Sequence, residues 1–116
     1  MAWTDYSSAP PSGSLVCPST AVASVAAVDV ASEKGVFPLI LVRSPEGLRA
    51  YVNACPHQYL PLNYRGEQLL SSCGTRLLCT AHGASFDAAT GEALAGAPCP
   101  LDAVPVVEDG GEIRIA

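Results

Sequence analysis

Basic residues are scarce in this chain. Only six Lys and Arg residues stand against eleven Asp and Glu, which gives a net charge of -5 and an isoelectric point near 4.7. Nucleic acids and anionic membrane surfaces repel an acidic protein, so neither is expected as a partner. We expect instead a partner that presents a basic docking face.

The chain also lacks a long hydrophobic run. The stretch from Ala21 to Ala31 is rich in Ala and Val, but it contains Ser24 and Asp29, is too short to span a bilayer and follows no basic region. Five cysteines are an odd number, so at least one thiol stays unpaired within the chain, and no export signal accompanies them. We therefore expect a soluble cytoplasmic protein, and in that reducing compartment cysteines usually bind metals.

The chain has no room for a second domain and little scope for long helices. Its 116 residues fit one domain, and a hydrophobic content of 49% fills one modest core. Ten glycines and ten prolines favour short strands joined by turns. Residues 1–14 are rich in Ser, Pro and Gly and are expected to form a flexible lead-in, followed by a mainly β domain over residues 15–116.

A β-hairpin is predicted directly before the first cysteine of interest. Val36 to Arg43 is a short apolar run, Leu48 to Asn53 alternates in polarity, and the turn sequence Ser44-Pro45-Glu46-Gly47 separates them. Four more short strands are predicted at Arg76 to Thr80, Ala84 to Phe86, Ala103 to Val107 and Glu112 to Ile115. The last two flank Asp109-Gly110-Gly111, which predicts a second hairpin at the C-terminal end. Pro105 restricts the strand that contains it to a sheet edge or a bulge.

Cysteine and histidine occur together at two places in the sequence. Cys55 and His57 form a C-x-H motif, and Cys79 and His82 form a C-x-x-H motif. Two loops that each supply one thiolate and one imidazole can build a two-Cys, two-His site, and in Rieske centres two His replace two Cys on one of the two irons. The chain has no other histidine, so none remains for the second iron site that oxygenases use.

The letters CPH and CTAHGASFD resemble the paired ligand loops of the Rieske ferredoxin family, and the resemblance covers roughly Leu15 to Ile115. It implies an all-β fold, a Rieske-type antiparallel β sandwich with a small cluster-binding subdomain. It implies one [2Fe-2S] cluster, with Cys55 and Cys79 on the inner iron and His57 and His82 on the outer iron. It also implies a non-catalytic electron carrier that a reductase reduces and that a terminal oxygenase or similar acceptor oxidises.

The residues around the motifs resemble those of oxygenase ferredoxins. High-potential respiratory members have a Ser and a Tyr where this chain has Ala84 and Phe86, and their extra disulfide joins positions that match Leu60 and Ala81. Without those hydroxyl groups, a potential toward the low end of the Rieske range of about -150 to +300 mV is expected. The segment from Pro98 to Pro100 resembles the proline-containing loop that covers the cluster in this family.

Two other functions are weighed against the electron carrier. Zinc also takes two Cys and two His, which would make the chain a zinc-stabilised binding module, although zinc motifs more often pair Cys with Cys and His with His. Alternatively, the Rieske fold could serve a redox-sensing or regulatory subunit. An enzyme is not expected, because no nucleophile and base pair or carboxylate dyad stands out.

The segment between the two motifs, residues 58–78, is longer than in most ferredoxin-type members, with the excess placed at Gly66 to Thr75. The other cysteines, Cys17, Cys73 and Cys99, lie in no ligand spacing. All three are interpreted as structural, since a free cysteine commonly behaves as a small buried hydrophobic side chain. Cys73 lies in the inserted loop, where it is expected to be a solvated or packed loop residue, with a reactive thiol as the alternative if it is exposed. The sequence leaves open a disulfide between Cys73 and Cys99.

Overall fold

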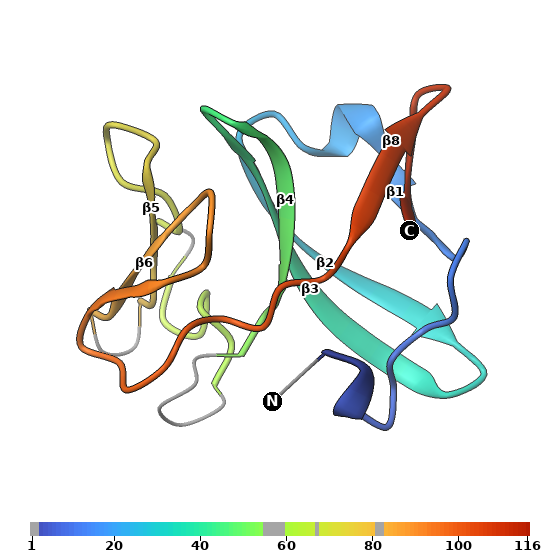
Figure 1. The fold of residues 1–116 in the computed structure, drawn as a ribbon, viewed down its shortest axis with the longest axis horizontal. Coiled ribbons are helices and arrows are strands. Elements are labelled where there is room, and N and C mark those ends of the chain that lie inside the picture. Colours follow the sequence, from blue (N-terminus) through green and yellow to red (C-terminus); the bar gives the residue numbers. More distant parts are fainter. Residues whose placement is uncertain (1–2, 55–59, 67, 81–82) are drawn as a thin grey trace.

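The computed structural model describes residues 3–54, 60–66, 68–80 and 83–116. These residues form three antiparallel sheets of three strands each, with 3-10 turns at Trp3–Asp5 and Ser19–Ala21 (Figure 1). The strands are β1 (Leu15–Pro18), β2 (Val25–Ser32), β3 (Gly35–Ser44), β4 (Gly47–Val52), β5 (Arg76–Leu78), β6 (Ser85–Asp87), β7 (Ala93–Ala95), β8 (Val106–Asp109) and β9 (Glu112–Ile115). The predicted all-β class is confirmed. No helix in the described ranges has the length and apolar character needed to cross a membrane.

The sheet β2-β3-β4 contains the predicted hairpin. β3 and β4 pair antiparallel down to Ser44 opposite Gly47, so the hairpin is confirmed. At the turn, the Ser44 hydroxyl donates to the Gly47 carbonyl at 2.8 Å and accepts from the Glu46 N–H at 3.2 Å. Gly47 has a φ of 123°, which a residue with a side chain rarely adopts. β2, which was not predicted, pairs with β3 from Val25 to Ser32.

The sheet β1-β9-β8 contains the C-terminal hairpin, which is also confirmed. β8 lies at the edge of the sheet, as Pro105 predicts. The strand begins at Val106 and not at Ala103, so its predicted start was wrong. Pro105 has no N–H to donate, and the Val104 N–H before it donates to the Ala50 carbonyl of β4 at 2.9 Å. The chain therefore runs beside β4 before it joins the sheet β1-β9-β8.

The sheet β5-β6-β7 forms the small subdomain that the resemblance implies. β5 and β6 lie within one or two residues of their predicted positions, whereas β7 was not predicted. The described part of the inserted stretch runs along β5, where the Leu78 N–H donates to the Leu69 carbonyl at 2.8 Å and the Ser71 N–H donates to the Arg76 carbonyl at 2.9 Å. Leu69 is 3% exposed. The insertion thus extends this sheet and contributes to its core.

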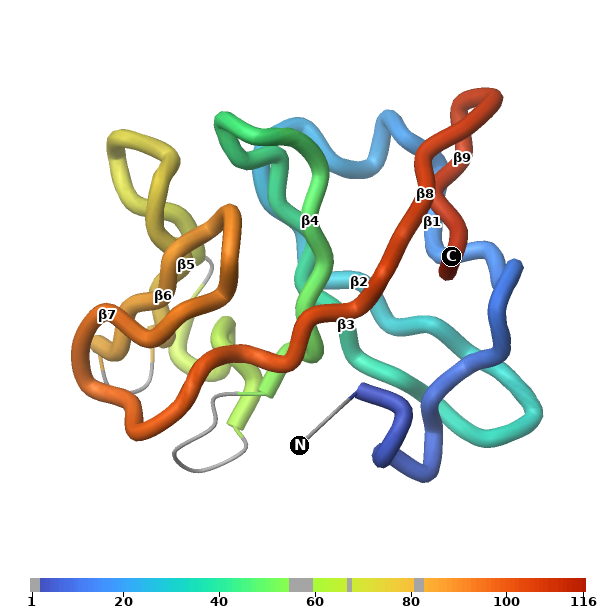
Figure 2. The backbone as a smooth tube through the Cα atoms, viewed as in Figure 1, coloured from blue at the N-terminus to red at the C-terminus, as the bar shows by residue number. Residues whose placement is uncertain are grey.

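The sheet β2-β3-β4 lies between the other two sheets (Figures 1 and 2). Alternate side chains of a strand point to opposite faces, so this sheet supplies residues to two cores. β3 and β4 contribute to both cores: Leu39, Leu41, Ala50 and Val52 to the one shared with β1 and β9, and Ile40, Val42 and Tyr51 to the one shared with β5 and β6. Burial on both faces explains why β3 is a nearly continuous apolar run.

Residues 3–14, expected as a flexible lead-in, contact the domain in this structure. Trp3 and Tyr6 pack on Phe37, with ring centroids 6.2 and 5.8 Å apart. The Tyr6 hydroxyl donates to a carboxylate oxygen of Asp102 at 3.0 Å, and Ala9 is buried. Aromatic rings can bury much apolar area for few residues, which compensates for the Ser, Pro and Gly around them.

Candidate metal centre

Three of the four predicted ligands, Cys55, His57 and His82, lie outside the described residues. Cys79 is described, and so are the residues that enter and leave both predicted ligand loops. The site is therefore described from Cys79 and from the residues that precede and follow each predicted ligand loop.

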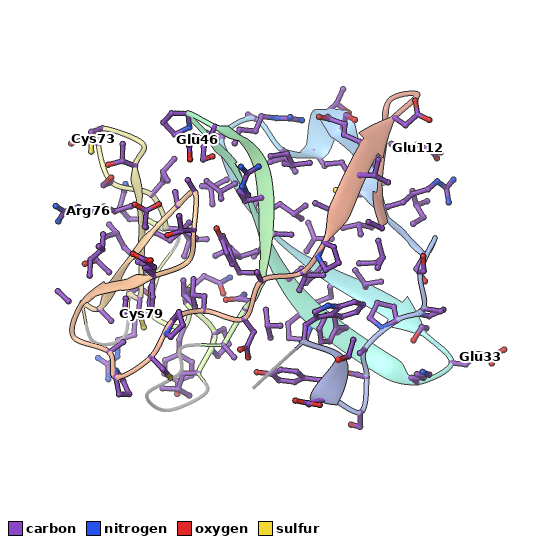
Figure 3. All side chains as sticks on the ribbon, viewed as in Figure 1. Glu33, Glu46, Cys73, Arg76, Cys79 and Glu112 are labelled. Carbon is purple, nitrogen blue, oxygen red and sulfur yellow. The ribbon has the colours of Figure 1, made fainter. Side chains whose placement is uncertain are left out.

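Cys79 directly follows β5, and only 1% of it is exposed. Its N–H donates to the Ala84 carbonyl at 2.8 Å, and its carbonyl accepts from the Gly83 N–H, also at 2.8 Å. Gly83 has a φ of 75°, a backbone conformation that favours glycine, and no atom of the described residues beyond its chain neighbours lies within 4 Å of the position a Cβ would take. The turn after β5 thus holds the thiol in the core at the end of the small sheet (Figure 3).

Asn53 connects the described residues on either side of the first predicted ligand loop. This residue follows β4 and is 6% exposed. Its Oδ1 accepts from the Leu62 N–H at 2.7 Å, and its Nδ2 donates to Asn63 Oδ1 at 3.1 Å. These two bonds join the chain before residue 55 to the chain after residue 59.

Leu62 also contacts the second ligand loop. The Thr80 N–H and hydroxyl both donate to the Leu62 carbonyl, at 2.8 and 2.7 Å. The Thr80 Oγ1 accepts from the Arg65 N–H at 3.0 Å. Because Thr80 directly follows Cys79, these bonds hold the residues that flank the two motifs next to each other. Sequence reasoning missed Asn53, Leu62 and Thr80, since an Asn after a strand or a Thr in a loop is common in ordinary turns.

The described residues fit an iron–sulfur cluster. A thiolate is the soft ligand that such clusters require, and an apolar shell limits the access of water to a metal centre. Cys79 belongs to the buried core that also contains Leu62, Leu77 and Phe86. Within the described ranges, no three His, Cys, Asp or Glu side chains gather where they could hold a metal ion, so these ranges offer no rival site.

The surroundings of the second loop carry no hydroxyl group at the two positions singled out in the sequence. Ala84 and Phe86 are both fully buried. A Cβ placed on Gly96 would lie 3.1 Å from the Ala84 Cα, so the chain after β7 passes close over this loop. The segment that follows, from Pro98 to Pro100, is exposed, and its covering role stays a prediction.

The other three cysteines differ from one another. Cys17 is 7% exposed and belongs to the core beneath β1, so its prediction as a small buried hydrophobic residue is confirmed. The expected burial is wrong for Cys99, which is exposed. Cys73 is also exposed, as a solvated loop residue, and neither cysteine forms a disulfide. Cys73 lies at the tip of the inserted stretch, at the opposite end of the small sheet from Cys79 (Figure 3), and Cys99 lies between two exposed prolines.

Cys73 is expected to react with iodoacetamide near neutral pH. Hydrogen bonds with the Ser71 hydroxyl at 3.4 Å and the Thr75 hydroxyl at 3.0 Å lower the pKa of its thiol to about 7. The alkylation rate of Cys73, followed by mass spectrometry, should therefore reach half of its maximum near that pH. In a Ser71→Ala, Thr75→Val variant the midpoint should move up toward 9.0, the ordinary value. Alkylation of Cys99 in the same samples is the control, and an unmoved Cys73 midpoint would contradict this account.

Comparison with known proteins identifies the fold. A family model for the Rieske [2Fe-2S] domain matches residues 13–107. The ferredoxin of carbazole 1,9a-dioxygenase from Nocardioides aromaticivorans IC177 superposes with a TM-score of 0.71 at 25% identity, over 91% of this chain and 98% of the ferredoxin. The Sphingomonas yanoikuyae B1 ferredoxin gives 0.68 at 30% identity, over 89% and 96%.

A third similar structure is a complex of reduced oxygenase and oxidized ferredoxin in carbazole 1,9a-dioxygenase. It gives a TM-score of 0.65 at 26% identity, over 88% of this chain and 90% of the matched chain. Curated protein sequences give no significant match.

The three antiparallel sheets make the chain an all-β protein, and the family match makes it an iron–sulfur protein. The chain belongs to the Rieske [2Fe-2S] domain family, and its cofactor is one Rieske-type [2Fe-2S] cluster.

A hydroxyl group introduced beside the second loop is expected to raise the reduction potential. Ala84→Ser or Phe86→Tyr adds a donor that stabilises the reduced, more negative cluster. A hydrogen bond stronger by one tenfold step in the reduced state corresponds to about 59 mV for one electron, so a rise of that order is expected by spectroelectrochemistry. Ala93→Ser, on β7 but outside the loop, is the control. An unchanged potential in both variants, with the cluster intact, would remove the argument.

Proposed function

We propose that this chain is a small electron carrier in which Cys55, His57, Cys79 and His82 bind one Rieske [2Fe-2S] cluster. The cluster supplies reversible uptake of a single electron. A reductase donates that electron, and a terminal oxygenase or a similar enzyme accepts it. The observation that carries the proposal is the similarity to two ferredoxins over nearly the whole of each, one of them the ferredoxin of carbazole 1,9a-dioxygenase.

The chain's own residues give the cluster two different sides. The buried thiol of Cys79 supports a place for the cysteine-bound iron against the core of the small sheet. The carbonyl of Cys79 and the N–H of Gly83 close the turn that contains His82 in the sequence. Gly83 itself is exposed. We assign the outer iron to the two histidines and the exit of the electron to their imidazole rings.

The net negative charge of the chain determines the kind of partner surface that we propose. A net charge of -5 favours an acceptor or donor with a basic docking face, and such association weakens as salt screens it. The complex of oxygenase and ferredoxin among the similar structures supports an oxygenase as one partner. The chain binds no substrate of its own in this proposal, and we place it in the cytoplasm.

The deciding experiment is electron paramagnetic resonance of the dithionite-reduced protein, purified without oxygen, with iron, zinc and acid-labile sulfide assayed on the same sample. Two irons, two sulfides and a low average g value are expected. A colourless protein with one zinc would replace the carrier with a zinc-stabilised module. Oxidation of the reduced protein by an oxygenase, at a rate that falls with salt, would then separate a carrier from a redox-sensing subunit.

A further inference from the structure

The backbone of one residue, Leu62, forms hydrogen bonds to both stretches of chain that carry the predicted ligands. The N–H of Leu62 donates to Asn53 Oδ1, two residues before Cys55. The carbonyl of Leu62 accepts two bonds from Thr80, one residue after Cys79. Leu62 is completely buried, so both of its backbone polar groups depend on these partners and not on water.

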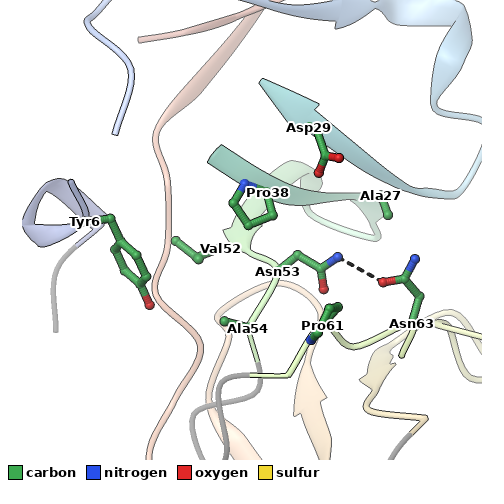
Figure 4. Close-up of a pocket in the computed structure, with 9 residues that line it drawn as sticks. All are labelled: Tyr6, Ala27, Asp29, Pro38, Val52, Asn53, Ala54, Pro61 and Asn63. Atoms are coloured by element: carbon green, nitrogen blue, oxygen red, sulfur yellow. Dashed lines mark hydrogen bonds between the residues drawn. The ribbon is translucent and has the colours of Figure 1, made fainter. Parts of the chain in front are cut away.

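The side chain of Asn53 is placed to accept the hydrogen bond from the Leu62 N–H. Its side chain follows the last residue of β4 and points back toward the chain that leaves the first loop (Figure 4). Figure 4 also shows its second bond, in which Nδ2 donates to Asn63 Oδ1 at 3.1 Å. Burial keeps this bond from exchanging with water, and a buried donor without an acceptor costs more than the bond itself contributes.

Thr80 completes the connection from the other side. Its hydroxyl donates to Leu62 and accepts from the Arg65 N–H, so both functions of the hydroxyl are used. Its own N–H reaches the same carbonyl. Two donors on one carbonyl restrict the residue after Cys79 in position and in rotation.

We infer that Asn53 and Thr80 are positioning residues for the cluster, which set the spacing of the two ligand loops through Leu62. The chain has Leu and Ala at positions 60 and 81, so no disulfide can join the loops there, and the hydrogen bonds perform that mechanical task. The inference rests on the proposed ligand set, because it gives the connected stretches their role. A cluster bound by two loops is lost when the loops separate, so the connection controls how long the cluster is retained.

The test variants remove side-chain bonds to Leu62, and each is paired with a variant that keeps them. Thr80→Val keeps the shape of the side chain but removes the hydroxyl, and Thr80→Ser restores the hydroxyl as the rescue variant. Asn53→Ala removes the acceptor for Leu62. Asn63→Ala is the matched control, because it removes the second bond of Asn53 and leaves the bond to Leu62 in place.

The measurement is the rate at which an iron chelator bleaches the oxidised holoprotein without oxygen. A hydrogen bond contributes a factor of about five, so Thr80→Val should lose iron about fivefold faster, and Asn53→Ala about tenfold faster or more. Thr80→Ser and Asn63→Ala should stay within about twofold of the wild type. The double variant should be slower than the product of the two single effects, because both act through Leu62. The g values of the reduced protein should shift in Thr80→Val and return in Thr80→Ser.

Amide hydrogen exchange on the same samples separates this inference from the proposed function. Faster exchange at Leu62 in Asn53→Ala, and at Arg65 in Thr80→Val, is expected whatever metal the protein holds. If the wild type holds zinc, the proposed function fails while exchange still tests the connection. Wild-type bleaching rates, g values and exchange in both variants would overturn the inference.

Discussion

Replacing Cys79 with alanine is expected to give a folded protein that retains no cluster. In the proposed ligand set Cys79 supplies one of two thiolates to the cluster, and alanine has no sulfur to replace it. Within the described ranges no three His, Cys, Asp or Glu side chains gather into a substitute site. Iron and acid-labile sulfide, measured after anaerobic purification, should fall to near zero. The visible bands and the signal of the reduced protein should disappear with them.

Cys17→Ala is the matched control for this result. Cys17 is also buried, at 7% exposure, but it lies in the core shared by the other two sheets. Both substitutions remove one sulfur atom from a packed interior, so a general loss of packing would affect both proteins alike. Cluster content should be normal in Cys17→Ala, and normal content in Cys79→Ala would refute the ligand assignment.

Gly91→Ala is expected to destabilise the whole domain by about 2–4 kcal/mol. Gly91 has a φ of 80°, and a Cβ there would lie 2.7 Å from Tyr51 Cε1. The ring cannot move aside easily, because Tyr51 is 2% exposed and its hydroxyl donates to the Ala88 carbonyl at 2.9 Å. The same burial raises the pKa of Tyr51 to about 12. The free energy of unfolding, measured by denaturant titration of the holoprotein, gives the cost.

Gly110→Ala separates the two parts of that cost. Gly110 also has a positive φ, of 60°, but no atom lies within 4 Å of its Cβ position. It should therefore lose only the conformational part, about 1–2 kcal/mol. Equal losses in the two variants would show that Tyr51 yields to the added methyl group, contrary to the expectation.

The sequence predicted the strands that local turn chemistry specifies. Ser44 to Gly47 marks its hairpin by residue type, and so does Asp109 to Gly111. β2 and β7 escaped prediction because both contain many alanines, which have little preference for strands, and pairing with β3 and with β6 decides their structure. Pairing with strands that are distant in the sequence therefore determines these two strands, which their own composition does not predict.

The candidate site divides in the same way. A Cys and a His separated by only one or two residues indicate a metal site, because few other functions need a thiol and an imidazole so close together. The bonds that Asn53 and Thr80 make to Leu62 span 9 and 18 residues, and no local pattern announces them. Cys73 is exposed because of the path that the inserted stretch takes along β5, and the sequence of that stretch does not predict this path.

The burial of β3 on both faces makes the protein a single cooperative unit. The small sheet cannot detach without uncovering Ile40 and Val42, while Leu39 and Leu41 on the same strand hold the other core together. Detachment of the whole small sheet is therefore coupled to global unfolding, which small domains undergo in one step. The colour of the cluster then reports the integrity of the entire domain, so a molecule that still carries its electron centre is also a molecule whose remaining surface is correctly folded.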